Sequence, residues 1–223
     1  MNIRVLYNVF LVRLGIRHIL PSDYINSIPV AESNEPMVEL PVDSFKTDGN
    51  VFVGRAGMIE RLVAAAKIVS EKGYHLYIYQ TYRSPQEQAE KRALLYEEMK
   101  AKYSDYPEDK ILRMLNVGVA GVGGGHQTGG AVDLSLCDKN GRALDMGTQY
   151  REHNPKTPTQ CKGLNSEQQK NRAILLEAMQ KAGFVNYPAE WWHYAYGDKM
   201  WAAYSNRRTA IYGILDMKCV GAC

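Results

Sequence analysis

Residues 118–136 constrain the fold of this 223-residue chain more than any other stretch. A glycine-rich run over residues 118–130 leads into Ala131–Leu136, where apolar and polar residues alternate. This period of two predicts a strand that turns its apolar side chains to a core and Asp133 to the opposite face. The run matches neither glycine pattern that binds nucleotide phosphates. We therefore expect its glycines to let the backbone pack closely around His126.

Helices and strands are predicted to mix without a regular strand–helix–strand rhythm, which favours the α+β class. Helical spacing and capping residues predict helices over residues 57–72, 84–102, 106–115 and 166–183. Aromatic and β-branched residues or alternation predict strands over residues 75–81, 131–136, 191–196 and 209–215.

The domain organisation that we expect is a single domain, in which helices flank a small antiparallel sheet. Four prolines lie between residues 21 and 55, and this stretch is expected to be extended and irregular. The prediction is an extended N-terminal segment over residues 1–53, packed on a domain of residues 54–215, and a C-terminal tail over residues 216–223.

Composition excludes several function classes. Apolar residues make up 45% of the chain and charged residues 23%, which excludes a disordered chain, and a net charge of +3 gives no case for nucleic-acid binding. No stretch approaches the roughly 18–20 apolar residues of a membrane span. The apolar run Val5–Val12 lacks the clean core and cleavage site of a secretory signal, so we expect a cytoplasmic location, with export as the alternative. The four cysteines are too few for a disulfide framework, and whether Cys219 and Cys223 pair stays open, as does the oligomeric state.

Two polar patterns indicate a specific kind of site only when they are considered together. Taken alone, Asp133 fits a solvated residue on an exposed sheet face, and Glu190-Trp-Trp-His193 fits a surface acid beside a half-buried histidine. Together, His126, Asp133 and His193 supply two imidazoles and one carboxylate, a three-ligand zinc set that leaves one position for water. Glu190 lies three residues before a ligand and is suited to take a proton from that water.

These motifs resemble the zinc D,D-peptidases of the VanX and VanY type, which are related to lysostaphin-like peptidases and the hedgehog domain. The family pattern is Ser-x-His-x6-Asp followed by Glu-x-x-His, and here it runs from Gly124 through His126 and Asp133 to Glu190 and His193. Further similarities lie at Tyr82-Arg-Ser-Pro85, Met146-Gly-Thr148 and residues 171–184, so the resemblance covers about residues 54–197.

The resemblance implies one zinc ion per chain, with Glu190 as the general base and Arg83 as the group that stabilises the oxyanion. Arg83 follows a predicted strand and directly precedes a capped helix start, so its backbone is expected to be rigid. The implied substrate is a small peptide that ends in D-Ala.

The sequence departs from the family pattern at two places. The serine two residues before the first ligand is Gly124. Where the VanX-type dipeptidases hold the substrate ammonium with an aspartate, this chain has Tyr150-Arg151-Glu152. Arg151 would repel an ammonium, and Glu152 replaces the aspartate only if the loop shifts by one residue.

Three functions are therefore compared. The first is a D-alanyl-D-alanine dipeptidase of bacterial cell-wall metabolism, and the second is a D,D-carboxypeptidase that acts on longer peptidoglycan peptides. The third is a non-catalytic zinc-stabilised binding module, which would not need both Glu190 and Arg83 beside the metal.

Overall fold

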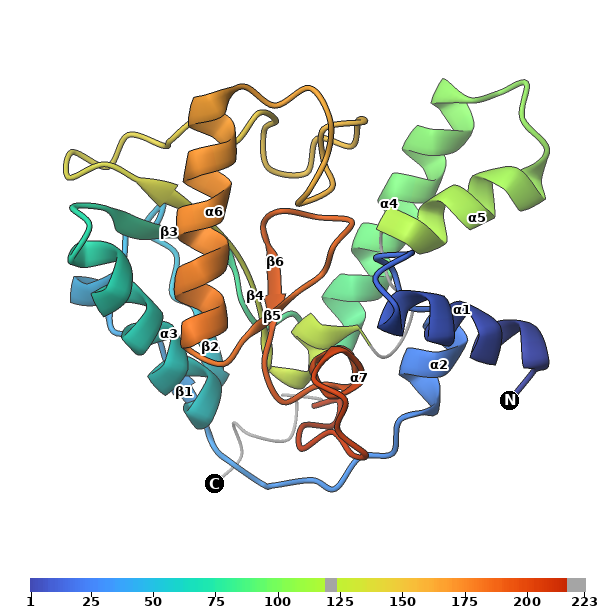
Figure 1. Cartoon of the computed structure of the whole chain (residues 1–223), viewed down its shortest axis with the longest axis horizontal. Helices are drawn as coiled ribbons and strands as arrows, with labels where there is room; N and C mark the ends of the chain where they lie inside the picture. The colour runs from blue at the N-terminus through green and yellow to red at the C-terminus, as the bar shows by residue number, and fades with distance from the viewer. Residues whose placement is uncertain (119–123, 216–223) are drawn as a thin grey trace.

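The computed structural model describes residues 1–118 and 124–215 (Figure 1). At its centre is a four-stranded antiparallel sheet, in the order β3-β4-β6-β5. The strands are β3 (His75–Gln80), β4 (Ala131–Cys137), β6 (His193–Ala195) and β5 (Val185–Asn186). A two-stranded antiparallel sheet pairs β1 (Met37–Glu39) with β2 (Val53–Arg55). The predicted α+β class with a small antiparallel sheet is confirmed.

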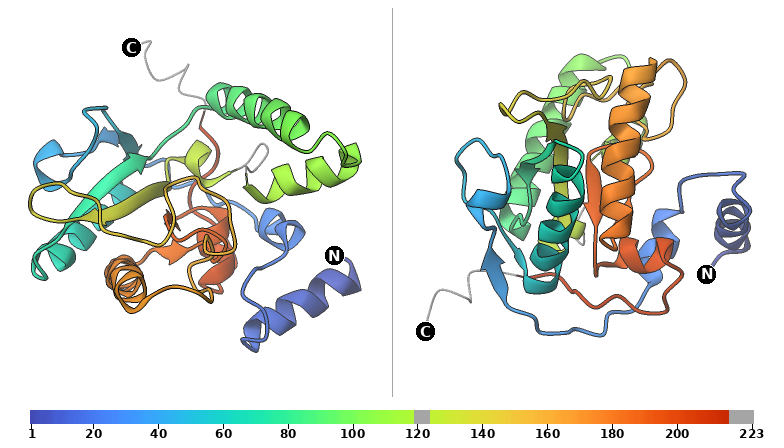
Figure 2. Two further views of the ribbon diagram at one scale, coloured as in Figure 1. Left: turned by 90° about the horizontal axis from the view of Figure 1, so that it is seen from above. Right: turned by 60° about the vertical axis from the view of Figure 1, so that its left-hand side comes forward.

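Helices flank this sheet on both sides, as Figure 2 shows for α3 with α6 on one side and α4 with α5 on the other. The helices are α1 (Ile3–Arg13), α2 (Ser22–Ser27), α3 (Ala56–Ser70), α4 (Pro85–Lys102), α5 (Glu108–Gly118), α6 (Ser166–Lys181) and α7 (Lys199–Tyr204), with 3-10 turns η1 (Val42–Ser44) and η2 (Gly125–Thr128). No helix among the described residues is both long and apolar enough to cross a membrane.

Sequence periodicity accounts for the helices that pack on the sheet. In α3, Met58, Leu62 and Val69 recur on one face and are fully buried, and the cluster that they join includes Leu175 and Met179 of α6. The four helices predicted from the sequence correspond to α3, α4, α5 and α6, with ends shifted by a few residues. The helix α4 begins with the predicted capping box, in which Ser84 and Glu87 each accept from the other's backbone N–H.

The N-terminal segment is more structured than predicted. Residues 21–55 are not simply extended, because α2 begins directly after Pro21, and Met37 of β1 pairs with Arg55 of β2. These short elements were not predicted from the sequence, because the prolines around them are typical of irregular structure. The segment packs on the rest of the chain: the backbone N–H of Ala31 bonds to the carbonyl of Ala210 at 2.8 Å, and the hydroxyl of Tyr212 donates to Glu35 at 2.6 Å. The domain boundary at residue 53 stays a prediction.

The predicted last strand, residues 209–215, is wrong. Only a single bridge between Val30 and Ala210 forms there, and the following residues run irregularly over the domain. The backbone N–H of Leu215 bonds to the carbonyl of Gln127, so this segment covers the site loop instead of extending the sheet. The predicted C-terminal tail, with Cys219 and Cys223, lies outside the described residues.

The register of the sheet places the polar residues of β4 at its centre. Asp133 lies opposite His193 of β6 on one side and opposite Gln80 of β3 on the other, where an irregularity skips Tyr79. Asp133 is only 5% exposed, so the alternative of a solvated sheet face is wrong. A buried carboxylate needs partners, and the neighbouring strands supply them.

Candidate metal centre

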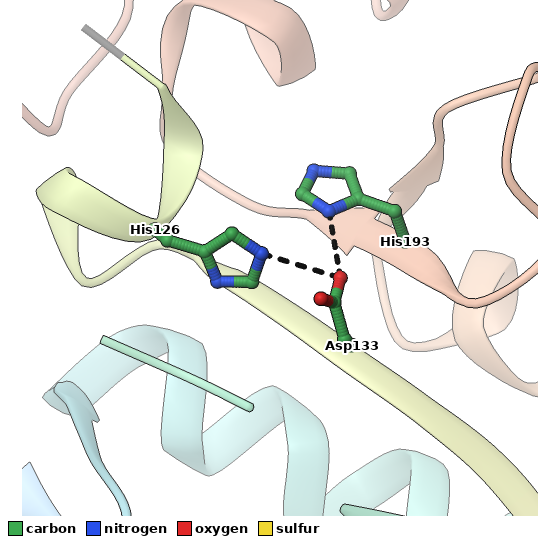
Figure 3. A group of neighbouring side chains, drawn as sticks. All are labelled: His126, Asp133 and His193. Atoms are coloured by element: carbon green, nitrogen blue, oxygen red, sulfur yellow. Dashed lines mark hydrogen bonds and ion pairs between the residues drawn. The ribbon is translucent and has the colours of Figure 1, made fainter. Parts of the chain in front are cut away.

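Three side chains from two separate stretches of the sequence converge above β4 (Figure 3). His126 comes from η2, Asp133 from β4 and His193 from the first residue of β6. Each offers one ligand atom, and the three atoms lie within 4.8 Å of one another. A spacing of this size suits a metal ion that all three atoms bind.

His126 is oriented by a backbone carbonyl. Its Nδ1 lies 2.6 Å from the carbonyl oxygen of Thr81, which can only accept, so Nδ1 carries the proton. The lone pair then belongs to Nε2, which lies 3.2 Å from Oδ1 of Asp133. Burial lowers the pKa of His126 and favours the neutral form that a metal requires.

Asp133 is bound on both oxygens. Its Oδ1 lies 2.8 Å from Nδ1 of His193, and its Oδ2 accepts a 2.8 Å hydrogen bond from the hydroxyl of Tyr150. Burial alone would raise the pKa of Asp133, but the charges and hydrogen bonds of His126 and His193 outweigh it and hold the pKa well below its usual range. The carboxylate is therefore ionised and can act as a ligand.

Glycine allows the loop that carries His126 to lie close to its neighbours. A Cβ on Gly125 would collide with the carboxylate of Asp198, and one on Gly130 would collide with the backbone oxygen of Tyr196. The expectation that glycines permit close packing around His126 is confirmed for these two positions. The glycine-rich residues 119–123 lie outside the described part of the chain.

Glu190 lines the same cleft as the three ligand residues. It lies in the turn between β5 and β6, where Nδ2 of Asn186 donates to the carbonyls of both Glu190 and His193 at 3.0 Å. Thr159 fixes the other end of that amide with a 2.5 Å hydrogen bond to Oδ1. Asn186 therefore holds the turn that places Glu190 beside the metal ligands, a role that the sequence did not indicate.

Burial raises the pKa of Glu190 to about 7, and the opposing charge of His193 limits the shift. A carboxyl group with a pKa near neutrality exchanges protons readily at neutral pH. The geometry therefore brings an acid–base group and a metal-ligand set into one cleft.

The profile of peptidase family M15, described as D-Ala-D-Ala dipeptidase, matches residues 45–211 of this sequence. This match covers well over half of the chain. The chain belongs to the D-Ala-D-Ala dipeptidase family. The resemblance inferred from the sequence motifs is thereby confirmed.

Curated relatives agree with this assignment. The D-alanyl-D-alanine dipeptidase of Enterococcus faecium is 28% identical over 168 residues, which cover 71% of this chain and 79% of that protein. The Escherichia coli K12 enzyme of the same name is 32% identical over 61% of this chain and 62% of its own length. The match to the Synechocystis dipeptidase, at 35% identity, spans only 37% of this chain and 38% of the relative.

Solved structures support the fold. A crystal structure of a mutant of the vancomycin resistance D,D-pentapeptidase VanY in complex with Zn(II) aligns with a TM-score of 0.51 at 20% identity, over 79% of this chain and 86% of that one. VanYB in complex with D-alanine-D-alanine aligns with the same TM-score at 19% identity. The chain thus has the fold of this family of zinc peptidases, and its His-Asp-His set has the donor types and the open position of a catalytic zinc site.

Arg83, the family's predicted oxyanion residue, is buried at the junction of β3 and α4. Its guanidinium donates to the side-chain oxygen of Gln88 at 2.5 Å and to that of Gln80. Its backbone N–H bonds to the carbonyl of His126, which joins the two segments of the site. Arg83 does not line the cleft, although its charge acts on Asp133.

The two predicted substrate residues have different environments. Arg151 lines the cleft, packs over the ring of Tyr150 at 4.7 Å and donates to Gln80 at 2.7 Å. Glu152 does not line it: its carboxylate accepts from the backbone N–H of Gln149 and from the side chain of Asn154. The role of Glu152 as an ammonium anchor stays a prediction, because it requires a shift of this loop.

The cleft contains residues that the sequence did not single out. The helix α4 contributes Lys91, and the loop after β4 contributes His153, which packs edge-on against Trp192. Helical periodicity alone did not show that Lys91 would face the metal ligands, because that depends on how α4 packs.

Proposed function

We propose that this protein is a zinc-dependent D,D-peptidase that hydrolyses D-alanyl-D-alanine in bacterial cell-wall metabolism. The observation that carries the proposal is the convergence of His126, Asp133 and His193 with Glu190 in one cleft. Family membership and the dipeptidases among its relatives support it. A binding module would need the ligands but not the buried acid beside them.

The residues of the site divide the reaction among them. His126, Asp133 and His193 would hold the metal. When bound, zinc supplies a Lewis acid that lowers the pKa of a water molecule to about 7 and polarises a carbonyl oxygen. Glu190 accepts the proton of the attacking water and passes it to the leaving amine. The family resemblance assigns to Arg83 the stabilisation of the negative charge on the carbonyl oxygen; held by its two glutamine partners outside the cleft lining, Arg83 would do this through its charge.

A D,D-carboxypeptidase is the second candidate, and the shape of the cleft favours it. The cleft has a volume of about 740 Å³, which lies within the range of roughly 300–1,000 Å³ for pockets that hold drug-sized ligands. This volume is larger than a dipeptide fills. Arg151, which occupies the sequence position where the dipeptidases of the family are expected to hold an ammonium, lines this cleft. Both features suit a longer peptide whose amine lies outside the site.

The experiment that separates these candidates is release of D-Ala by the zinc-loaded protein from two substrates. The substrates are D-Ala-D-Ala and an N-acylated tripeptide that ends in D-Ala-D-Ala. Cleavage of the dipeptide alone establishes a dipeptidase, and cleavage of the acylated peptide establishes a carboxypeptidase. If neither substrate is cut although the protein binds zinc, the D,D-peptidase proposal fails and the result favours the zinc-stabilised binding module.

The location follows from the substrate. A dipeptidase that removes D-Ala-D-Ala acts in the cytoplasm, where the dipeptide is made, and this is the location that we propose. A carboxypeptidase acting on exported precursors would act outside it. Cell fractionation of the native source, with immunodetection of the chain, distinguishes the two.

A further inference from the structure

One wall of the cleft carries positive charge that, among the described residues, forms no ion pair with a carboxylate. The helix α4 turns Gln88, Lys91, Leu95 and Glu98 into the cleft at spacings of three and four residues, which places them on one helix face. Lys91 is partly buried there, in a cleft that Arg151 also lines. Among the described residues, neither cation forms an ion pair with a carboxylate.

This arrangement is unfavourable without an anion. Burial first, and then the charges of Arg83 and Arg151, lower the pKa of Lys91 to about 8. The ammonium therefore remains mostly charged at neutral pH while it is partly desolvated beside two guanidinium groups. The acids that act on Lys91, Asp133 and Glu190, are a metal-ligand residue and the proposed base, so their charges are not available to neutralise it.

The conformation of Arg151 indicates that its position is fixed. Its backbone φ is +64°, which lies in the left-handed region that residues other than glycine rarely adopt. Its guanidinium donates to Gln80, the same acceptor that holds Arg83, so the two guanidinium groups are anchored to one amide. The strained backbone and the shared hydrogen-bond acceptor together hold the positive charge of Arg151 at the cleft wall.

We propose that Lys91 and Arg151 form a subsite for a carboxylate of the peptide substrate. The inference rests on the proposed peptidase function and adds to it two residues, Lys91 and Arg151, that select substrates with a carboxylate. Two carboxylates of such a peptide are suitable: the terminal carboxylate of the last D-Ala, and an acidic group on the N-terminal side of the scissile bond. Both would form charge-assisted hydrogen bonds with the ammonium and the guanidinium.

Calorimetry on the zinc-loaded Glu190→Ala protein tests this without consuming the ligands. Three peptides are compared: acetyl-D-Ala-D-Ala, its C-terminal amide, and succinyl-D-Ala-D-Ala amide. We expect at least one of the two anionic peptides to bind about tenfold or more tightly than the neutral amide. Whether the preferred peptide carries its carboxylate at the C-terminal or the N-terminal end shows which carboxylate of the substrate the subsite binds.

Variants on α4 assign the preference to Lys91. In the Glu190→Ala background, Lys91→Gln should reduce the preference to less than about threefold, and Lys91→Arg should retain most of it. Lys100→Gln removes the same charge from the same helix outside the cleft and should keep the full preference. Melting temperatures show whether each variant is folded, and Arg151→Gln gives a second test on another element.

Two results would overturn the inference: no carboxylate preference in the parent protein, or a preference that survives Lys91→Gln and Arg151→Gln. The D-Ala release assay on the unsubstituted protein tests the peptidase proposal separately. If D-Ala is not released but the preference depends on Lys91, the peptidase proposal fails and the carboxylate subsite stands.

Discussion

Asp133 distributes its two carboxylate oxygens among three neighbours, and this sharing explains why the site needs residues beyond the metal ligands. One oxygen faces both histidines, and the other accepts from Tyr150. The ring of Tyr150 is itself fixed, because it stacks on Tyr79 with ring centres 4.2 Å apart. Tyr150 therefore orients a ligand without being one, as outer partners of metal ligands commonly do.

Replacing Tyr150 by phenylalanine tests this role. Tyr150→Phe keeps the stacking and removes only the hydrogen bond to Asp133. We expect zinc affinity to fall by about 10–100-fold, measured by competition with a chelator. Tyr106→Phe, between α4 and α5 and outside the cleft lining, is the control. An unchanged affinity in Tyr150→Phe would mean that the bond does not support the ligand.

Arg83 permits a second test at the residue scale. Arg83→Lys keeps the positive charge but loses the planar fork that reaches both Gln80 and Gln88. We expect kcat to fall about 100-fold or more while zinc content stays at one per chain, because the positive charge that acts on the oxyanion is no longer held in one position. Steady-state kinetics and metal analysis check this. A kcat within threefold of the parent would reduce Arg83 to a structural residue.

At the scale of elements, the sequence predicted best the parts with strong periodicity. The helices α3, α4, α5 and α6 were predicted, and β3, β4 and β6 arise from the expected strand segments. The short elements of the N-terminal segment were missed, because turn formers dominate there and two three-residue strands become visible only when they pair. The last predicted strand failed because residues 209–215 pack across the site loop instead of along a sheet edge.

An ion-pair clamp joins α3 and α6, and it should make stability depend on pH. Glu177 on α6 accepts from Lys72, just after α3, at 2.6 Å and from Lys181 at 2.7 Å. The hydrogen bonds of Lys181 and then of Lys72 lower the pKa of Glu177 from 4.5 to about 2. A folded-state pKa below the unfolded value stabilises the fold above pH 4.5, and this stabilisation is lost as the pH falls towards 2.

Glu177→Gln should therefore melt at a slightly lower temperature than the parent at pH 7, because the clamp is exposed and screened. The difference should shrink as the pH falls from about 4.5 to 2. Thermal melts across this range measure it, with the exposed Glu60→Gln on α3 as the control. A difference that does not change with pH would contradict the clamp.

At the scale of the whole molecule, the catalytic cleft is assembled from segments that are remote in sequence. The metal ligands come from the sheet and η2, Lys91 from α4, and Ile25 from α2. The motifs predicted the ligand set because its spacing is local to two segments. They did not predict Lys91 or Asn186, whose roles depend on how whole elements pack. The family motifs therefore describe the lining of the cleft only in part.

The central claim is that zinc at His126, Asp133 and His193 and the base Glu190 act together, and titration of metal into the chelator-treated protein tests it most directly. Release of D-Ala, from whichever of D-Ala-D-Ala and the acylated tripeptide the zinc-loaded protein cleaves, should rise in proportion to added zinc and level off at one equivalent. Glu190→Gln should bind the same single equivalent and release D-Ala about 10²–10⁴-fold more slowly. Full activity without metal, or activity in Glu190→Gln close to that of the parent, would contradict the account.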